Sequence, residues 1–459
     1  MPLSVPESRV LELWQTTIKD RPDLVTEENE PLKIIYPGRL NDGRGADLRD
    51  AVIATRHGLL QGDIEIHVKS SDWWAHGHHE DKAYNPVILH VVYRHDAGKE
   101  TVLQNGMEVP TLALDEYAEE QAGQRVTSAF SPVIPPPCHA GPVLSKVLDE
   151  AGDTRFMIKK ESFRRVIIEK GPAQALYGGI MTALGYSQNK TAMAGLAGIV
   201  PLRGLEEIAS GVKTDNGCLL QLQAILLGAA GLLPSQRFIK RPPGSPPDEY
   251  EIILERQWVK TGEKAGMSAD DWRFFKVRPG NYPVRRIAAM CYLLVRYRDG
   301  GILKGLKTAL EETIEDNART LEESLAVDAD GYWRRYLDFG LPVSGTAPAL
   351  VGRERAAEIV LNVLLPFYAA ASGAAYAVPG AQPGLEEKTL DIFHRYRAPS
   401  ENSLERHVRK QFGMAPETAA TARRRQGLIH IYKTFCTQGR CGECMLGRVE
   451  RKDTITKKQ

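Results

Sequence analysis

The feature that most constrains the fold of this chain is an alternating run of polar and apolar residues at positions 63–69. Asp63, Glu65, His67 and Lys69 alternate with isoleucine or valine. A period of two is typical of a β-strand, in which successive side chains point to opposite faces. We expect one face of this strand to lie in a core and the other to present two carboxylates, an imidazole and an amine. Such a face is suited to binding a divalent metal ion and activating a water.

The segments around this strand predict a small mixed core. An amphipathic pattern over residues 7–19 predicts a helix. Apolar runs at 32–36, 51–55 and 87–93 predict three more strands, the last of them buried on both faces. The polar and aromatic stretch 71–84 is expected to be a loop or a short helix. The predicted order is therefore helix, three strands, loop or helix, and a fourth strand.

Composition and proline placement predict how the rest of the chain is divided. With 42% hydrophobic residues, 25% charged residues and a net charge of +1, the chain is typical of a soluble globular protein. We find no long apolar run and no signal peptide, and therefore expect a cytoplasmic protein without a membrane span. Three consecutive prolines before Cys138 exclude a helix there, and Ala- and Leu-rich segments beyond them predict helices. We expect a sheet core at 1–132, a helical domain at 133–426, a cysteine segment at 427–450 and a basic tail at 451–459.

Histidines and carboxylates are concentrated around the polar strand. Seven of the eleven histidines lie between positions 57 and 95. A lone histidine is usually structural, but this density indicates chemistry because it coincides with a group of acidic residues. Those acidic residues are Asp47, Asp63, Glu65, Asp72, Glu80 and Asp81.

The order and spacing of these elements resemble the PD-(D/E)xK nuclease superfamily, whose core is helix, three strands, helix, strand. That superfamily has an Asp at the start of the second strand and a (D/E)-x-K triplet on the third, and Asp47 and Glu65 match the two acids. The resemblance implies that Asp47 and Glu65 bind Mg²⁺ or Mn²⁺, with Asp63 as an added ligand, while a basic group serves the attacking water. The third position of the triplet is His67 where the superfamily has lysine, and Lys69 lies one pleat further along the same face. Either residue is expected to take the lysine's role.

The histidines after the strand extend this resemblance. In nucleases of this kind the following helix can add a general acid or phosphate contacts, and His76 and His79 are the candidates for such a catalytic role. The alternative is a surface loop anchored by Trp73 and Trp74.

Three cysteines near the C-terminus predict a second metal site. Cys436, Cys441 and Cys444 have the spacing C-x4-C-x2-C with glycines between them, which allows a chain to fold around an ion. The fourth ligand is expected to be Cys138 or His430. Zinc and an iron–sulfur cluster are both compatible with thiolate ligands. A bond from Cys138 to this ion would join the chain end to the sheet core.

Several arginines are candidates for contacts with nucleic-acid phosphates. Arg278 lies in a rigid, proline-bounded loop, and Arg423, Arg424 and Arg425 precede the cysteine segment. The alternative for each is a solvated helix face or pairing with a carboxylate of the same chain.

Longer motifs resemble one family along nearly the whole chain. These motifs are GRLNDGRGADLRDAVI, GDIEIHVKSSDWWAHGHHEDKAYNPVILHVVY, ALGYSQNK, VRPGNYPVRRIA and the closing QGLIHIYKTFC with GRCGECMLG. They resemble an uncharacterised bacterial family labelled domain of unknown function 2851, in which the first motif usually reads GPDF. This chain has Gly45-Ala46-Asp47-Leu48, so the acid is kept. The resemblance implies relatedness, but it does not indicate an activity.

Three functions remain open from the sequence. The first is a metal-dependent nuclease that hydrolyses phosphodiester bonds in DNA or RNA, on an α+β fold with a restriction-endonuclease-like sheet, a helical region and a cysteine metal-binding segment. The second is a catalytically degenerate nuclease fold that binds nucleic acid or serves as a scaffold, because His67 replaces the expected lysine. The third is a zinc hydrolase of a small substrate that uses the histidines at 76–79.

Overall fold

The described part of the chain forms two compact units. The computed structural model describes every residue except 1–4, 17, 19–20, 22–23, 42, 116, 118–143, 240, 242–245, 276, 315–317, 373–383, 445 and 447–459. The first unit takes in Met1–Gly152, Glu401–Ala420 and Arg424–Gln459, and the second takes in Asp153–Ser400 and Thr421–Arg423. The contacts therefore group the C-terminal segment with the N-terminal sheet, unlike the linear division expected from composition. Cys138 and the tail at 451–459 lie outside the described residues.

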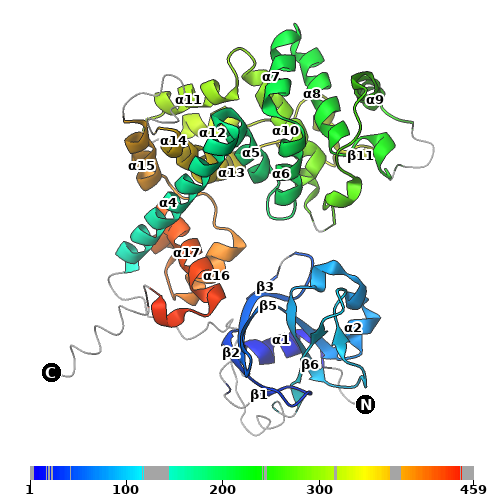
Figure 1. Ribbon diagram of the computed structural model, residues 1–459, viewed down its shortest axis with the longest axis vertical. Coiled ribbons are helices and arrows are strands. Elements are labelled where there is room, and N and C mark those ends of the chain that lie inside the picture. The colour runs from blue at the N-terminus through cyan, green and yellow to red at the C-terminus, as the bar shows by residue number, and fades with distance from the viewer. Residues whose placement is uncertain are drawn as a thin grey trace, which may run out of the picture. The chain divides into compact units, whose positions relative to one another are not determined.

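A mixed sheet forms the centre of the first unit (Figure 1). Its strand order is β1-β2-β4-β5-β6-β9, and β3 pairs with β4. Strands β2, β4 and β5 are antiparallel neighbours, whereas β5, β6 and β9 run parallel. The four predicted strands are confirmed as β2, β4, β5 and β6, and β5 begins earlier than predicted. The bounds are β1 Leu24–Val25, β2 Pro31–Tyr36, β3 Arg39–Leu40, β4 Leu48–Thr55, β5 Gly58–Lys69, β6 Val87–Arg94 and β9 Thr111–Ala113; a separate hairpin pairs β7 Thr101–Val102 with β8 Glu108–Val109.

The predicted N-terminal helix covers one face of this sheet. Helix α1 (Glu7–Thr16) is shorter than predicted and buries Val10 and Trp14 completely. These side chains share a core cluster with Ile64 and Ile66, the apolar side of the alternating strand. Burying such side chains contributes about 1.5–3 kcal/mol each, so this half of the alternation fixes the register of β5.

The polar side of β5 faces away from that core, toward a tight run of short helices. These are α2 (Asp72–Ala75) and the 3-10 turns η2 (His78–Glu80) and η3 (Lys82–Tyr84). The run is anchored by Trp73, which is fully buried and donates from its indole Nε1 to the Val102 carbonyl at 3.0 Å. The expected role of Trp73 as a packing anchor is thus confirmed, and it holds the histidines of this run close to β5.

A second cluster in the first unit includes Tyr36 and Val52 of the sheet together with C-terminal side chains such as Phe412 and Ile431. At Gly439 an added Cβ would lie 3.1 Å from Val52, so the chain end passes close to β4. The elements are the first part of α4 (Leu144–Lys170), α16 (Ser403–Gln411), η9 (Pro416–Ala419), α17 (Ala422–Thr434), η10 (Cys436–Gln438) and η11 (Cys441–Glu443).

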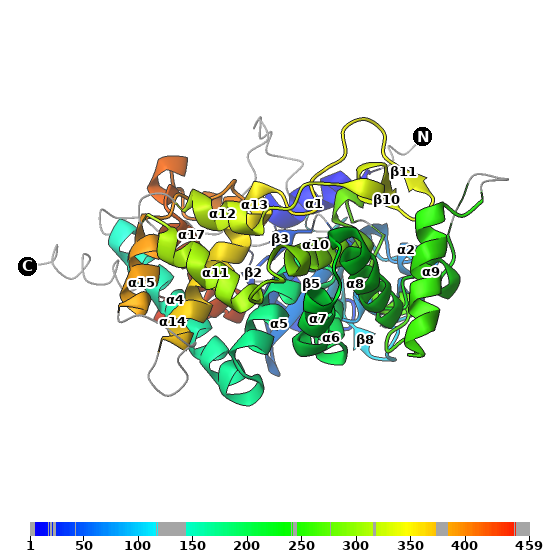
Figure 2. The ribbon, with the colours of Figure 1, turned by 90° about the horizontal axis from the view of Figure 1, so that it is seen from above.

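The second unit is helical around a large apolar core. Helices α7, α8 and α10 contact one another and run side by side in both views (Figures 1 and 2). Among the described residues, one stretch, Asp215–Gln236, is long and apolar enough to cross a membrane, and 67% of its most apolar window is buried inside the protein. The bounds are α5 Pro172–Leu184, α6 Lys190–Ile199, α7 Leu202–Gly211, α8 Asp215–Ala229, η4 Pro234–Gln236, α9 Glu249–Thr261, η5 Ala269–Asp271, η6 Pro279–Asn281, α10 Pro283–Arg296, α11 Ile302–Glu312, α12 Arg319–Leu325, η7 Gly331–Arg334, β10 Tyr336–Asp338, β11 Leu341–Pro342, α13 Arg353–Ile359, the π-helical η8 Val360–Leu364, α14 Leu365–Ala371 and α15 Leu385–Arg395.

Candidate metal centre

Three imidazoles converge on the polar face of β5. His67 Nε2 lies 3.2 Å from His76 Nδ1 and 3.2 Å from His78 Nε2. One ligand nitrogen from each ring lies within 4.8 Å of the other two. Gly77, with a φ of 71°, supplies the left-handed turn between His76 and His78. This turn brings two loop histidines back onto the strand residue.

Two carboxylates border the imidazole group. Glu65 Oε1 lies 3.2 Å from His78 Nε2 and 3.6 Å from His67 Nε2. Its other oxygen, Oε2, accepts a hydrogen bond of 3.0 Å from the backbone N–H of Asp47. The Asp47 carboxylate in turn accepts from the Ile66 N–H at 3.1 Å. Asp47 and Glu65 thus lie next to each other and are joined through backbone amides; their shared role as metal ligands stays a prediction.

The electrostatics at this point favour an added cation. Desolvation and the neighbouring Glu65 carboxylate raise the pKa of Asp47 to about 7, even though the residue is exposed at the surface. Like charges held together raise a carboxyl pKa because the second ionisation is opposed by the first. A divalent ion between the two carboxylates would offset that repulsion.

A chain of buried hydrogen-bond contacts that begins at His90, here called the His90 relay, orients the His67 ring. His67 Nδ1 lies 2.9 Å from His90 Nε2, and His90 Nδ1 lies 2.9 Å from the Thr101 hydroxyl, which contacts Thr111. Burial, reinforced by the neighbouring histidines, lowers the pKa of His67 to about 2 and that of His90 to about 3. Both rings are therefore neutral. If His67 Nδ1 and His90 Nδ1 carry the protons, every donor has an acceptor and the lone pair of His67 Nε2 points into the group, which is the usual support for a metal-binding histidine.

Tyr84 is a member of the site that sequence reasoning did not single out. Its ring centroid lies 3.8 Å from that of His78. Desolvation, with the Glu65 and Asp47 charges, raises the pKa of its phenol, which stays protonated as a donor. His90 is one of the seven histidines between positions 57 and 95, and the sequence likewise does not indicate its role in the site. The position of both residues depends on how the loop folds over the sheet, which no local pattern reveals.

Donor chemistry fits a transition metal at this centre. Imidazole nitrogens suit zinc, iron and related ions, whereas magnesium prefers oxygen ligands. Three imidazoles and the Glu65 carboxylate would provide a mixed nitrogen and oxygen set. This differs from the all-oxygen set of Asp47, Asp63 and Glu65 expected for Mg²⁺ or Mn²⁺.

Asp63 belongs to a different polar neighbourhood. Its Oδ1 accepts from the Asp50 N–H at 3.2 Å, and the charges that act on its pKa come from Arg49, Asp50 and Arg39. Asp50 adopts a φ of 61° where β4 bulges between Leu48 and Ala51. A bulge re-aims the strand locally, and here it turns an amide toward Asp63. The assignment of Asp63 as a metal ligand stays a prediction.

Two further predicted catalytic residues lie outside the histidine group. Lys69 is largely exposed, and its Nζ lies 3.5 Å from Asp96 Oδ2. His79 packs its ring 4.5 Å from Trp74 and lies near Glu80. Of the two candidates for the lysine's role, His67 therefore lies beside the Glu65 carboxylate and Lys69 does not.

Among the described cysteines of the second predicted site, Cys436 begins the turn η10, Cys441 begins the turn η11 and Cys444 directly follows η11. Cys436 and Cys444 are buried, whereas Cys441 is exposed. Burial and the nearby Cys444 raise the pKa of the Cys441 thiol, while Cys436 accepts a contact of 3.7 Å from Gln411 Nε2. The three sulfurs do not form a group within 4.8 Å of one another in the described chain. His430 is buried and lies 3.5 Å from the Thr434 hydroxyl.

The predicted nucleic-acid arginines have mixed surroundings. Arg423 forms a bidentate ion pair with Asp153, and Arg424 forms one with Asp149. Arg425 Nη1 lies 3.5 Å from Glu405 Oε2. These three guanidinium groups follow the alternative of pairing inside the chain. Arg278 is exposed in the loop before η6.

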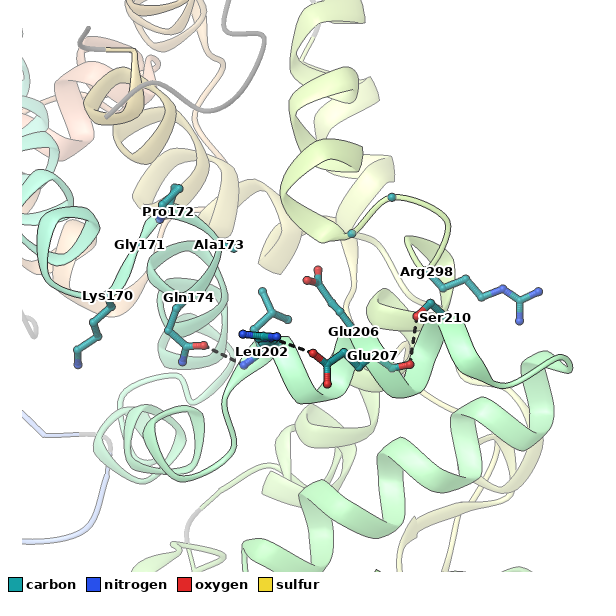
Figure 3. A pocket seen from close by; sticks show the side chains of 13 residues that line it. Lys170, Gly171, Pro172, Ala173, Gln174, Leu202, Glu206, Glu207, Ser210 and Arg298 are labelled. Carbon is teal, nitrogen blue, oxygen red and sulfur yellow. Dashed lines mark hydrogen bonds and ion pairs between the residues drawn. The ribbon is translucent and has the colours of Figure 1, made fainter. Parts of the chain in front are cut away.

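An open pocket of about 580 Å³ lies in the helical unit. Figure 3 shows its lining from α5 and α7, where the Leu202 N–H donates to the side chain of Gln174. Arg203 forms an ion pair with Glu207. Glu206 accepts from the Ile302 N–H at 3.0 Å. Several of its polar groups are thus engaged in bonds within the protein, and none of the predicted site residues is in its lining.

A variant of Asp47 tests the carboxylate repulsion. A carboxyl whose folded pKa is raised binds protons more tightly in the folded state, so its contribution to stability falls as the pH rises from about 4 to about 7. We expect metal-free Asp47→Asn to be more stable than wild type at pH 8 and to lose that advantage at pH 4, since Asn keeps the acceptor for Ile66. Urea unfolding midpoints at both pH values measure this; an advantage that is larger at pH 4 would contradict it.

Comparison with known proteins gives one match. The model of the family described as "Protein of unknown function (DUF2851)" matches residues 7–398, and thus ends before the cysteine segment. No curated protein and no solved structure matches the chain. The match spans most of the chain, including the sheet and the histidine group, so this protein belongs to the DUF2851 family.

Proposed function

We propose that this protein is a metal-dependent nuclease that hydrolyses phosphodiester bonds in DNA or RNA. The observation that carries the proposal is the meeting of Glu65 with Asp47 beside the imidazoles of His67, His76 and His78. Apart from the two-residue strands β1 and β3 and the 3-10 turns η2 and η3, the element order is α1, β2, β4, β5, α2, β6, which supports the proposal because it resembles the helix, three strands, helix, strand of the PD-(D/E)xK superfamily. Asp47 directly precedes the second of these strands and Glu65 lies on the third, as that resemblance requires.

The metal would be held by His67, His76, His78 and Glu65, with Asp47 at its edge. Such an ion polarises a phosphoryl oxygen and lowers the pKa of a water. Among the ions expected from the sequence, the imidazoles favour Mn²⁺ over Mg²⁺, and they also suit Zn²⁺.

The chain's own residues prepare the site in three ways. The His90 relay holds His67 neutral and oriented. Tyr84, whose ring contacts that of His78, keeps a phenol proton available as a donor. Asp47, which lies next to Glu65 at the edge of the proposed metal, is our candidate general base.

Two other functions have specific support. The three-imidazole group favours a zinc hydrolase of a small substrate, because it does not require a nuclease. The engagement of Lys69 with Asp96 favours a binding or scaffold protein on a degenerate nuclease fold.

One assay panel separates these functions. The purified protein is incubated with duplex DNA, single-stranded DNA, RNA and a small phosphodiester ester, each with Mg²⁺, Mn²⁺ or Zn²⁺. Cleavage of a nucleic acid supports the nuclease, and cleavage of the small ester alone supports the zinc hydrolase. Salt-dependent nucleic-acid binding without turnover under any metal supports the binding or scaffold protein and contradicts the nuclease.

We also carry forward two expectations from the sequence. One is zinc or an iron–sulfur cluster at Cys436, Cys441 and Cys444, with Cys138 or His430 as the fourth ligand; visible absorption of anaerobically purified protein would distinguish a cluster from zinc. The other is a cytoplasmic location with nucleic acid as the partner.

A further inference from the structure

We propose that the metal centre depends on the C-terminal helix α17, because Tyr432 of this helix holds the bulge of β4 that places Asp47 beside Glu65. Tyr432 and Asp50 are then positioning residues, and neither is a metal ligand. The inference rests on the proposed function. It adds to that proposal a requirement for a residue that lies 382 positions from Asp50 along the chain.

The bulge of β4 sets which residues of β4 and β5 face each other. Between the pairs Leu48–Ile64 and Ala51–Gly62, two residues of β4 oppose a single residue of β5. Asp50 is one of these two residues. Because the side chains of a strand alternate between its faces, closing the bulge would shift the chain before Leu48 by one position against β5.

Asp47 directly precedes β4 and lies on the side of the bulge that would shift. Its N–H donates to Glu65 Oε2 at 3.0 Å, and its carboxylate accepts from the Ile66 N–H at 3.1 Å. A shift of one position would remove this donor from Glu65. The bulge therefore supports the orientation of a proposed metal ligand, as the hydrogen-bond partners of metal ligands generally do.

The Asp50 side chain is held by two other elements of the same unit. Its Oδ2 accepts a hydrogen bond of 2.9 Å from Arg39 Nε in β3 and one of 3.0 Å from the Tyr432 hydroxyl in α17. The φ of 61° at Asp50 costs free energy in a residue other than glycine. The two side-chain bonds offset this cost, because both are made only when Asp50 occupies the bulge.

Tyr432 is itself fixed by its surroundings. It is 1% exposed, and its ring meets those of Tyr36 and His407 edge to face, with centroids 6.0 and 6.1 Å away. The Tyr36 hydroxyl lies 2.6 Å from His407 Nε2, which joins β2 to α16. Apolar side chains already fill the cluster that packs these helices on the sheet, so packing alone does not require a phenol. The Tyr432 hydroxyl is the part of this contact that is directed at Asp50.

Calorimetric titration of the full chain with Mn²⁺ tests the inference, and the ion that counts is the one that Glu65→Gln removes. Mn²⁺ is used because thiolates favour softer ions, so the cysteines compete little. Tyr432→Phe removes one hydroxyl and keeps the ring. Tyr396→Phe is the matched control, since the Tyr396 hydroxyl donates to the Glu322 carboxylate at 2.6 Å in the other unit.

We expect Tyr432→Phe to raise the apparent Kd for Mn²⁺ at least about five-fold, because losing this hydrogen bond leaves the bulged register less populated before the ion binds. Asp50→Ala should raise it at least about ten-fold, since it removes both side-chain bonds. Adding Tyr432→Phe to Asp50→Ala should change the Kd by less than about two-fold, because the phenol acts through Asp50. Asp50→Asn keeps an oxygen for both donors and tolerates the positive φ, so its Kd should stay within about three-fold of wild type. Tyr396→Phe should bind as wild type does.

The inference is overturned if Tyr432→Phe binds Mn²⁺ as wild type does. It is also overturned if Tyr396→Phe weakens binding equally, which would indicate a general loss of stability, or if the Tyr432 and Asp50 changes add, which would mean that the phenol acts by another route. In each of these cases the metal centre stands, because wild type still binds the ion that Glu65→Gln removes. Wild type without such an ion would contradict the metal centre itself, and this inference with it.

Discussion

Replacing Glu65 with glutamine is expected to lower the rate of nucleic-acid hydrolysis at least about 1000-fold, because a bound metal supplies several kcal/mol of charge stabilisation and about 1.4 kcal/mol corresponds to a factor of ten. Glutamine has the same shape and keeps an oxygen for the Asp47 N–H, so the fold of the site is retained. It removes the negative charge that would bind the ion. Initial rates on the best substrate of the panel measure the effect.

Glu80→Gln is the matched control for this loss. Glu80 lies two residues after His78, but its side chain is 80% exposed. The same change of charge there should leave the rate within about two-fold of wild type, because surface charges act weakly on a site in water. A Glu65→Gln variant as active as Glu80→Gln would contradict the proposed role of Glu65.

Metal binding is expected to raise the thermal stability of the first unit, and His76→Ala is expected to remove most of this gain. A ligand at about 1000 times its Kd stabilises the folded state by about 4 kcal/mol, and a unit of this size gains roughly 2–4 °C per kcal/mol, so the midpoint should rise by about 8–16 °C. His76 is exposed, whereas His67 and His78 are buried, so its removal costs the metal-free protein little. Scanning calorimetry with and without Mn²⁺ or Zn²⁺ measures the difference.

His57→Ala is the control for metal binding by exposed histidines. His57 lies in the turn between β4 and β5 and is exposed. Its removal should leave the metal-dependent rise unchanged. Equal loss of the rise in His57→Ala and His76→Ala would mean that the ion binds nonspecifically to surface imidazoles.

The sequence predicted the sheet well because each strand has a local pattern. Ile64 and Ile66 alternate with the polar residues, so the period of two specifies both the strand and its core face. The proximity of Asp47 to Glu65 could also be predicted, because it follows from strand order. Lys69 could not be placed in this way, since its distance from the site depends on the competing Asp96.

The imidazole group could not be derived from strand patterns. His76 and His78 reach His67 because Gly77 turns the chain and Trp73 anchors the short helix, and both effects are tertiary. Density of histidines in the sequence was the available signal, and it indicated a site without showing which three rings converge. The sequence also could not predict that Asp63 lies in a different polar neighbourhood from Glu65, because this depends on the bulge at Asp50.

Metal content per chain tests the central claim most directly. We predict that plasma mass spectrometry of protein reconstituted with Mn²⁺ or Zn²⁺ and then desalted will show about one ion fewer in a Glu65→Gln, His76→Ala double variant than in wild type. A Cys441→Ser, Cys444→Ser variant should keep that ion. Equal metal content in wild type and the double variant, with loss confined to the cysteine variant, would contradict a metal centre at the polar face of β5.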